Sequence, residues 1–248
     1  MISQNEQTAR SRDAAVFYLA AKSNVIANGF AAEIDWQEGA SLDGLSEPVF
    51  LREAAWVILS SGLSEQVVRK CFPGISTAFN AWSSAEGIWR HRRRCRAHAL
   101  TVFSSERKID AILAICGFVA RYGFERFRVL LVDDGLAFLM RFKFLGPATG
   151  RHLAKNIGFA LAKPDRHLKR IAGMLGYVNV SDLCAEIATL VGDSIPVVDV
   201  VLWRYATLNR SYATQFKMGL EHPTSMVPTP SDTTFSFGKF ASRDDCSD

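Results

Sequence analysis

The sequence has no long uninterrupted apolar run, which excludes the usual transmembrane helix. No stretch of about 20 residues, the length that a helix needs to cross a bilayer, is free of charged side chains. The N-terminus also lacks the basic, apolar and small-residue order of a secretory signal peptide. We therefore expect a cytoplasmic protein without a membrane partner.

Paired cysteines are also missing. The 5 cysteines are scattered, with no C-x-x-C pair among Cys71, Cys95, Cys116, Cys184 and Cys246. Zinc sites and iron–sulfur clusters need closely spaced thiolates, so we expect neither. Free thiols in a reducing compartment are the remaining expectation.

Alternating β-type segments are scarce, whereas apolar residues recur with helical spacing along most of the chain. An all-α fold follows. The predicted helices cover residues 10–28, 49–60, 64–70, 75–81, 85–104, 108–122, 125–132, 135–143, 149 onward, 166–176, 180–189 and 196–208. Residues 30–37 are expected to form an ordered loop. The Pro-, Ser- and Thr-rich residues 221–248 are expected to be a mobile tail.

Basic residues outnumber acidic ones only slightly, with 29 Lys and Arg against 25 Asp and Glu and a formal charge of +4. Their position is therefore more informative than their number. The densest run spans residues 89–98 and includes Arg92 and Arg94. It is either a solvated helix face or a surface that binds DNA phosphates.

The segment from Phe144 to Gly158 predicts a helix, a tight Gly-Pro turn and a second helix. The first amides of a helix have no partners within it, so they can bind a phosphate oxygen. The expected donors are the backbone N–H groups of Gly146, Ala148, Thr149 and Gly150.

Asp165 follows Pro164 and precedes an amphipathic segment, so its plainest role is that of a helix N-cap. The hairpin at 144–158, followed closely by Asp165 and the basic residues after it, resembles the helix-hairpin-helix superfamily of DNA glycosylases. The resemblance covers residues 49–207, although Ala148 stands where the second hairpin glycine is usual. It implies a two-lobed helical fold with a cleft, in which Asp165 is catalytic and double-stranded DNA is the partner.

The resemblance also bears on the type of reaction. Bifunctional members carry a nucleophilic Lys at the start of the second hairpin helix, where this chain has Arg151. Because Arg stays protonated, it cannot form a Schiff base. The chain is therefore expected to be a monofunctional glycosylase, with a DNA-contacting Arg151. No cofactor is expected, other than a monovalent cation at the hairpin.

Candidate pocket residues come from earlier helices. Glu53 and Trp56 share one helix face and could hold a flipped base, or they could be a surface charge and a core residue. Glu33 and Trp36 are further pocket candidates, and Leu63 after Gly62 is a candidate wedge into the base stack.

The predicted organisation is one two-lobed domain over residues 1–220. The hairpin lobe would cover about 84–194, and the N- and C-terminal helices would form the other lobe. The function expected of a monomer of this kind is removal of a damaged or modified base, which leaves an abasic site. One alternative is the same chemistry aimed at hypermodified viral DNA, as a bacterial defence. The other is a noncatalytic DNA-binding module in which Asp165 is only a cap.

Overall fold

The structure, a computed structural model, describes residues 4–209, 211 and 212, and every regular element within them is a helix. This confirms the predicted all-α class. The elements in chain order are α1 (Gln4–Ala27), α2 (Ala31–Glu38), α3 (Glu47–Ser60), α4 (Glu65–Ala78), the 3-10 turn η1 (Asn80–Trp82), α5 (Ala85–Arg90), α6 (Arg92–Val102), α7 (Glu106–Tyr122), α8 (Phe124–Leu139), α9 (Pro147–Asn156), α10 (Arg166–Met174), α11 (Val180–Val191) and α12 (Ile195–Leu208). The end of the predicted domain and the predicted tail lie outside the described residues.

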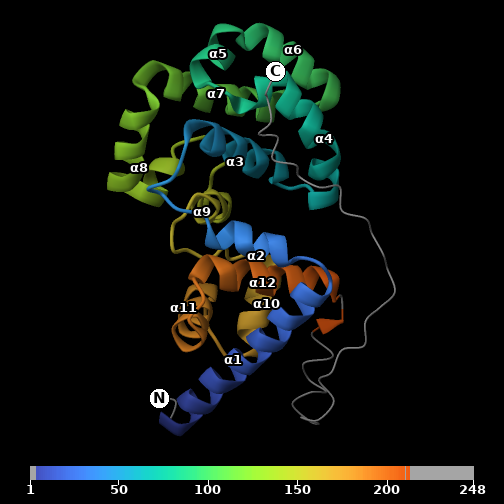
Figure 1. The fold of residues 1–248 in the computed structure, drawn as a ribbon, viewed down its shortest axis with the longest axis vertical. Helices are drawn as coiled ribbons and strands as arrows, with labels where there is room; N and C mark the ends of the chain where they lie inside the picture. Colours follow the sequence, from blue (N-terminus) through green and yellow to red (C-terminus); the bar gives the residue numbers. More distant parts are fainter. Residues whose placement is uncertain (1–3, 210, 213–248) are drawn as a thin grey trace, which may run out of the picture.

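The buried side chains form two hydrophobic clusters, stacked along the long axis of the molecule (Figure 1). The upper cluster draws on residues 45–157, from the loop before α3 through α9. The lower cluster combines α1 and α2 with residues 162–212. The predicted division into lobes stays a prediction. The described helices include none that is both long and apolar enough to span a membrane.

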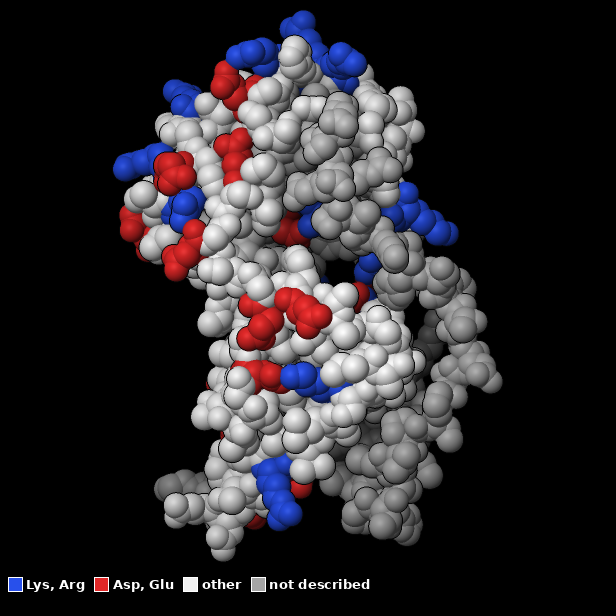
Figure 2. Space-filling model, viewed as in Figure 1, with Lys and Arg blue, Asp and Glu red and all other residues white. Residues whose placement is uncertain are grey.

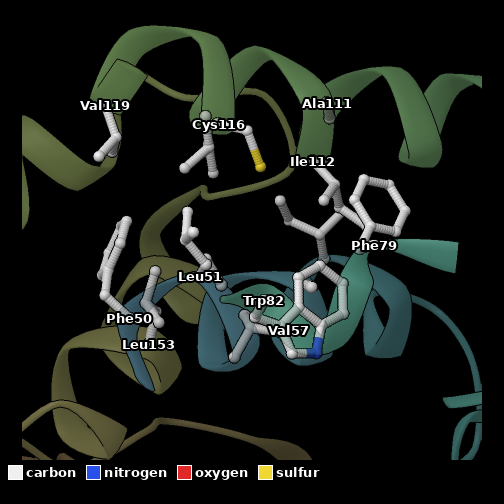
Figure 3. Close-up of a cluster of buried hydrophobic side chains, with 14 of the residues drawn as sticks. Phe50, Leu51, Val57, Phe79, Trp82, Ala111, Ile112, Cys116, Val119 and Leu153 are labelled. Carbon is white, nitrogen blue, oxygen red and sulfur yellow. The ribbon is translucent and has the colours of Figure 1, made fainter. Parts of the chain in front are cut away.

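The upper cluster is built around α3 and α7, whose apolar faces meet in Figure 3. Leu51 points from α3 toward Cys116 on α7, and Val57 of α3 and Ile112 of α7 belong to the same cluster. All four side chains are at most 2% exposed, so each contributes close to its full burial energy, which is of the order of 1.5–3 kcal/mol for a large aliphatic side chain. This core holds α9 from above, because Leu153 of α9 packs into the same cluster.

The buried side chain of Lys108, on α7, holds the turn between α3 and α4 in place. Its Nζ donates to the carbonyl oxygens of Leu59, at 2.7 Å, and Ser61, at 2.6 Å. These carbonyls lie at the C-terminal end of α3, where backbone acceptors lack helical partners. Burial lowers the pKa of Lys108. The turn that carries Leu63 is therefore fixed in place.

Residues 30–37, predicted as a loop, are instead mostly the helix α2, so that prediction was wrong. The segment has a weak apolar pattern, and only Ile34 and Gln37 are buried. Its stabilising contact is tertiary: Gln37 Nε2 donates to the carbonyl oxygen of Lys155 on α9, at 3.1 Å. Local sequence could not indicate a contact across 118 residues.

Three other boundaries differ from the predicted ones. α4 continues through Pro73, because Phe72 and Ile75 on either side are buried against the upper cluster. The predicted helix 85–104 is broken at His91, since α5 lies along α7 whereas α6 also lies along α4. The predicted helices 125–132 and 135–143 form a single α8 with a kink at Gly135.

The loop after α9 passes very close to the loop before α3. Gly158 has a φ of +105°, and a Cβ placed there would lie 2.6 Å from the backbone nitrogen of Leu42. Only glycine fits this crossing. The crossing joins the end of α9 to the chain that leads into α3, and so fixes the path from α9 to Asp165.

Candidate functional site

Asp165 is the N-cap of α10, as its sequence context predicts. Its Oδ1 accepts from the backbone N–H groups of His167, at 2.8 Å, and Leu168, at 3.0 Å. Its Oδ2 makes no hydrogen bond to any described residue, and the side chain is only partly buried. The cap therefore uses one carboxylate oxygen and leaves the other available to a ligand.

The start of α9 uses some of the amides that were expected to bind a phosphate. The Gly146 N–H donates to Thr149 Oγ1, at 2.8 Å, and the Gly150 N–H donates to the Gly146 carbonyl oxygen, at 2.6 Å. Ala148 and Thr149 lie in the first turn of α9, where backbone N–H groups have no acceptor within the helix. The geometry therefore favours these two as the donors to an anion.

A layer of charged and amide side chains lies between the two hydrophobic clusters. We call it the polar layer; its members are Gln37, Glu53, Lys155, Asn156, Lys163 and Asp199. They come from α2, α3, α9 and α12 and from the loop before α10. Each helix of the layer presents at least one of them, so the layer connects parts of the chain that belong to different clusters.

The centre of the polar layer is a buried ion pair. Lys155 Nζ lies 2.9 Å from Asp199 Oδ1, and the two side chains are 6% and 4% exposed. The second oxygen of Asp199 accepts from the backbone N–H of Lys163, at 2.6 Å. This contact holds the chain two residues before Asp165, so α9 and α12 together position the cap.

Two basic groups near the ion pair have lowered pKa values, which favours their neutral forms. Burial lowers the pKa of Lys163, although the carboxylate of Asp165 opposes this shift. Its ammonium forms no ion pair or hydrogen bond with the described part of the chain. Burial also lowers the pKa of His152 well below 6.5, with the positive charges of Lys163 and Lys155 acting in the same direction. Burial therefore disfavours the charged forms of both Lys163 and His152, while Asp165 favours the charged form of Lys163.

Glu53 belongs to this layer rather than to an open pocket. It is 4% exposed, with its Oε2 accepting from Asn156 Nδ2 at 3.0 Å and its Oε1 lying 2.8 Å from the Arg52 guanidinium. Burial raises its pKa. Trp56 packs against the upper cluster and makes an edge contact with Phe72 at 5.1 Å. Both side chains have structural partners, and their assignment to a base pocket stays a prediction.

Glu33 is also engaged, through an ion-pair group that joins α2, α4 and α12. Arg204 Nε donates to Glu33 Oε2 at 2.8 Å, and Arg204 also contacts Glu65 of α4 at 3.2 Å. Trp36, by contrast, is 43% exposed, and Leu63 is 41% exposed at the α3–α4 turn. Of the pocket and wedge candidates, only these two present much apolar surface to solvent.

The structure does not bring Arg92 and Arg94 together with Asp165. Both lie at the start of α6, at the top of the molecule in Figure 1, whereas α10 lies in the lower half. Arg151 lies on α9 within the same helix as Ala148 and Thr149, and its guanidinium has no ion pair within the described ranges. The predicted phosphate-binding residues therefore form two separate groups.

Sequence reasoning missed Lys155, Asn156, Lys163, Asp199 and Arg204. One signal was present: Asp199 is a single carboxylate inside the apolar run of α12. An acidic residue in such a run needs a buried cation or a metal as its partner. The identity of that partner, Lys155, lies 44 positions away and is not readable from the pattern.

Cys71, Cys95, Cys116 and Cys184 are free thiols, as expected, and Cys246 lies outside the described residues. The described side chains include no group of three His, Cys, Asp or Glu that could hold a metal ion. The sequence matches no protein-family model, and a search of curated proteins found no significant match.

Proposed function

We propose that the chain is a monofunctional DNA glycosylase that flips a damaged or modified base from duplex DNA and hydrolyses its N-glycosidic bond with Asp165. The observation that carries the proposal is the state of this carboxylate. One oxygen is fixed by the first amides of α10, and the other is unpaired and accessible. A carboxylate held in this way can stabilise the positive charge that develops on the sugar.

The chemistry needs only one carboxylate and a water molecule. Water adds to C1′ of the sugar as the bond to the base breaks, and Asp165 takes the proton from that water. The leaving base takes up a proton from solvent, Asp165 returns its proton to solvent, and an abasic site remains. Electrostatic stabilisation of the oxocarbenium-like transition state is the larger contribution expected of Asp165.

DNA would be held by the residues around Asp165. The Ala148 and Thr149 amides and Arg151 on α9 supply donors for a phosphate, on the pattern of a helix-hairpin-helix motif. Lys163 adds an unpaired ammonium two residues from Asp165. The two separate hydrophobic clusters, stacked one above the other (Figure 1), support a two-lobed arrangement with the DNA between the lobes.

The test is incubation of the full chain with duplexes that each carry one modified base. We expect free base release from at least one duplex, with strand breaks only after alkali. Alkylated purines and bulky hypermodified bases are the two substrate sets to compare, and cleavage of the latter alone would favour a defence role. DNA binding without base release from any duplex would favour a noncatalytic module instead.

Borohydride trapping tests the monofunctional part separately. We expect no covalent adduct, because Arg151 stands at the position of the usual nucleophile. An adduct with the wild-type chain would mean attack by an amine. Its loss in Lys163→Arg, which keeps the positive charge, would identify Lys163 as that amine and overturn the proposed hydrolysis.

A further inference from the structure

The start of α6 carries a concentration of positive charge that the fold does not require. Arg92, Arg93 and Arg94 are consecutive, exposed, and form the first turn of the helix, which contains no acidic residue. The N-terminal end of a helix is itself the positive end of the helix dipole. Three cations there repel that end and each other, so they lower the stability of α6.

Nearby arginines show what paired side chains look like on the same surface. Arg96 contacts Asp110 at 2.6 Å and Glu106 at 2.7 Å, and Arg90 contacts Glu86 at 2.6 Å. By contrast, Arg92, Arg93 and Arg94 have no carboxylate within ion-pair distance in the described part of the chain. In Figure 2, Lys and Arg side chains gather at the top of the molecule, over α5 and α6. An anionic partner could therefore bind the three arginines of this patch without displacing a carboxylate of the described residues.

An aromatic groove lies beside this patch, between α5 and α7. It is an open groove of about 730 Å³, and its lining residues are Glu86, Trp89, Ala114, Gly117, Phe118, Ala120, Arg121 and Tyr122. Trp89 is 39% exposed and Tyr122 is 49% exposed. Large aromatic side chains are costly to leave in water, so their exposure on two walls of one groove indicates a ligand with flat apolar faces.

The Trp89 ring is held in position by a glycine. A Cβ at Gly117 would lie 2.7 Å from Cζ3 of the Trp89 ring, so the ring occupies the space that any other residue would fill. A glycine inside a helix costs about 1 kcal/mol relative to alanine. The packing of the Trp89 ring against Gly117 offsets this cost. Binding to a ring that is already positioned loses little side-chain entropy.

Each exposed ring also has its own arginine. The Arg92 guanidinium carbon lies 4.8 Å from the centre of the Trp89 ring, and that of Arg121 lies 5.4 Å from the centre of the Tyr122 ring. Arg92 also donates to the Trp89 carbonyl oxygen, at 3.1 Å, but it is exposed and can exchange this contact for a phosphate. A flat face next to a cation occurs twice in one groove, and a nucleic acid strand offers the complementary groups, a flat base and an anionic phosphate, in every nucleotide.

We propose that this surface binds single-stranded DNA, with bases stacked on Trp89 and Tyr122 and phosphates contacted by Arg92, Arg93 and Arg94. A duplex keeps its bases stacked inside and offers these rings nothing to bind. An acidic peptide would satisfy the arginines but has no row of planar groups for the rings. Only an unpaired strand satisfies both features of the surface. The choice of DNA over RNA rests on the proposed function.

The position of the surface gives it a role apart from base removal. α5 and α6 lie at the end of the molecule remote from α10 (Figure 1), so one nucleotide cannot contact both Trp89 and Asp165. The surface instead anchors the protein to DNA that contains unpaired stretches.

Fluorescence anisotropy with a labelled oligothymidine and the full chain tests this proposal. We expect tighter binding to oligothymidine than to a duplex of equal length at the same salt concentration. Tyr122→Leu keeps the apolar contact with Phe118 but removes the aromatic face, and should weaken binding about tenfold. Tyr122→Phe keeps the ring and should bind as the wild type does.

Salt dependence separates the charges from the rings. Arg93→Gln with Arg94→Gln should lower the slope of log affinity against log salt by roughly 1.4, or about 0.7 for each lost phosphate contact. Tyr122→Leu should leave this slope unchanged. Arg12→Gln, at an exposed position on α1, is the matched control and should change neither quantity.

Several results would overturn the proposal. They are absence of oligothymidine binding at low salt, equal binding of the duplex, and an unchanged affinity in Tyr122→Leu. Tighter binding of oligouridine than of oligothymidine would reject DNA as the occupant. The proposed glycosylase reaction can be rejected separately. Oligothymidine binding without base release from any modified duplex would reject the reaction and leave the binding surface supported.

Discussion

Lys155 in the polar layer and Arg93 at the start of α6 are both cations on helices, yet the fold treats them in opposite ways. Lys155 is 6% exposed and lies 2.9 Å from Asp199, whereas Arg93 is exposed and has no carboxylate partner among the described residues. A buried charge must be compensated by the fold, because water cannot do so. An exposed charge without a partner is instead compensated by solvent, and remains available to a ligand. The comparison separates charges that hold the protein together from charges that can hold a partner.

The largest effect is expected from breaking the buried pair. Lys155→Met leaves the Asp199 carboxylate buried without its cation, and should lower the free energy of unfolding by about 3–5 kcal/mol. Urea denaturation measures this change. Lys155→Met combined with Asp199→Asn should recover part of the loss, since Asn still accepts from the Lys163 amide. If Lys155→Met alone unfolds with the same free energy as the wild type, the ion pair does not stabilise the fold.

A large effect on turnover, without an effect on stability, is expected at Asp165. Asp165→Asn keeps the Oδ1 acceptor that caps α10 but removes the negative charge. Turnover should fall by roughly two orders of magnitude or more, while affinity for DNA stays near that of the wild type. Single-turnover base release measures the rate, and Asp182→Asn in the first turn of α11 serves as the control. Retained turnover would leave Asp165 as a cap only.

His152 allows the polar layer to be tested by pH. Because its pKa is lowered in the folded state, the folded protein binds fewer protons here than the unfolded chain below pH 6.5. Stability from this group is complete above pH 6.5 and is lost as the pH falls, at up to about 1.4 kcal/mol per pH unit. His152→Gln should remove this dependence.

Unfolding of the wild type and of His152→Gln at a series of pH values between 7 and 5.5 gives the difference directly. Glu53 acts in the opposite direction, because its raised pKa makes the folded state gain stability as the pH falls toward 4.5. This contribution is shared by both proteins and cancels. A difference that stays constant with pH would show that His152 does not titrate differently in the folded state.

The smallest effect on stability is expected at the start of α6, and its sign is the informative part. Arg92→Ala with Arg94→Ala removes two cations from the positive end of the helix dipole. The free energy of unfolding should rise slightly, by a few tenths of a kcal/mol per residue at low salt, and the gain should fade as salt is added. A loss of more than about 1 kcal/mol would mean that these arginines support the fold.

Whether a feature depends on neighbouring or on distant residues explains what could be predicted from the sequence. Features set by neighbouring residues were readable: Pro164 and Asp165 mark the start of α10, and the apolar periodicity gives the all-helical class. Features set by distant residues were not. α2 depends on the contact between Gln37 and the Lys155 carbonyl, and the burial of Lys155 depends on Asp199.

In the candidate site, too, the features set by local sequence were predicted and those set by distant residues were not. Asp165 was found because its cap is local, and the Ala148 and Thr149 amides because a turn precedes their helix. Glu53 was placed on the correct helix, but its partner Asn156 on α9 could not be read from spacing. The separation of Arg92 from Asp165 was also hidden, since distance along a chain of helices does not give distance in space.

The composition of the two hydrophobic clusters has a consequence for the order in which the protein is made. The upper cluster uses the continuous stretch 45–157, so all its residues are synthesised before α12. The lower cluster needs Ala14 and Phe17 of α1 together with Val197 and Leu202 of α12. During synthesis the apolar face of α1 therefore stays uncovered until α12 emerges. Asp165 enters its final environment only then, when Asp199 arrives to hold the chain before it. A chain that stops before α12 would carry the complete upper cluster but no assembled candidate site.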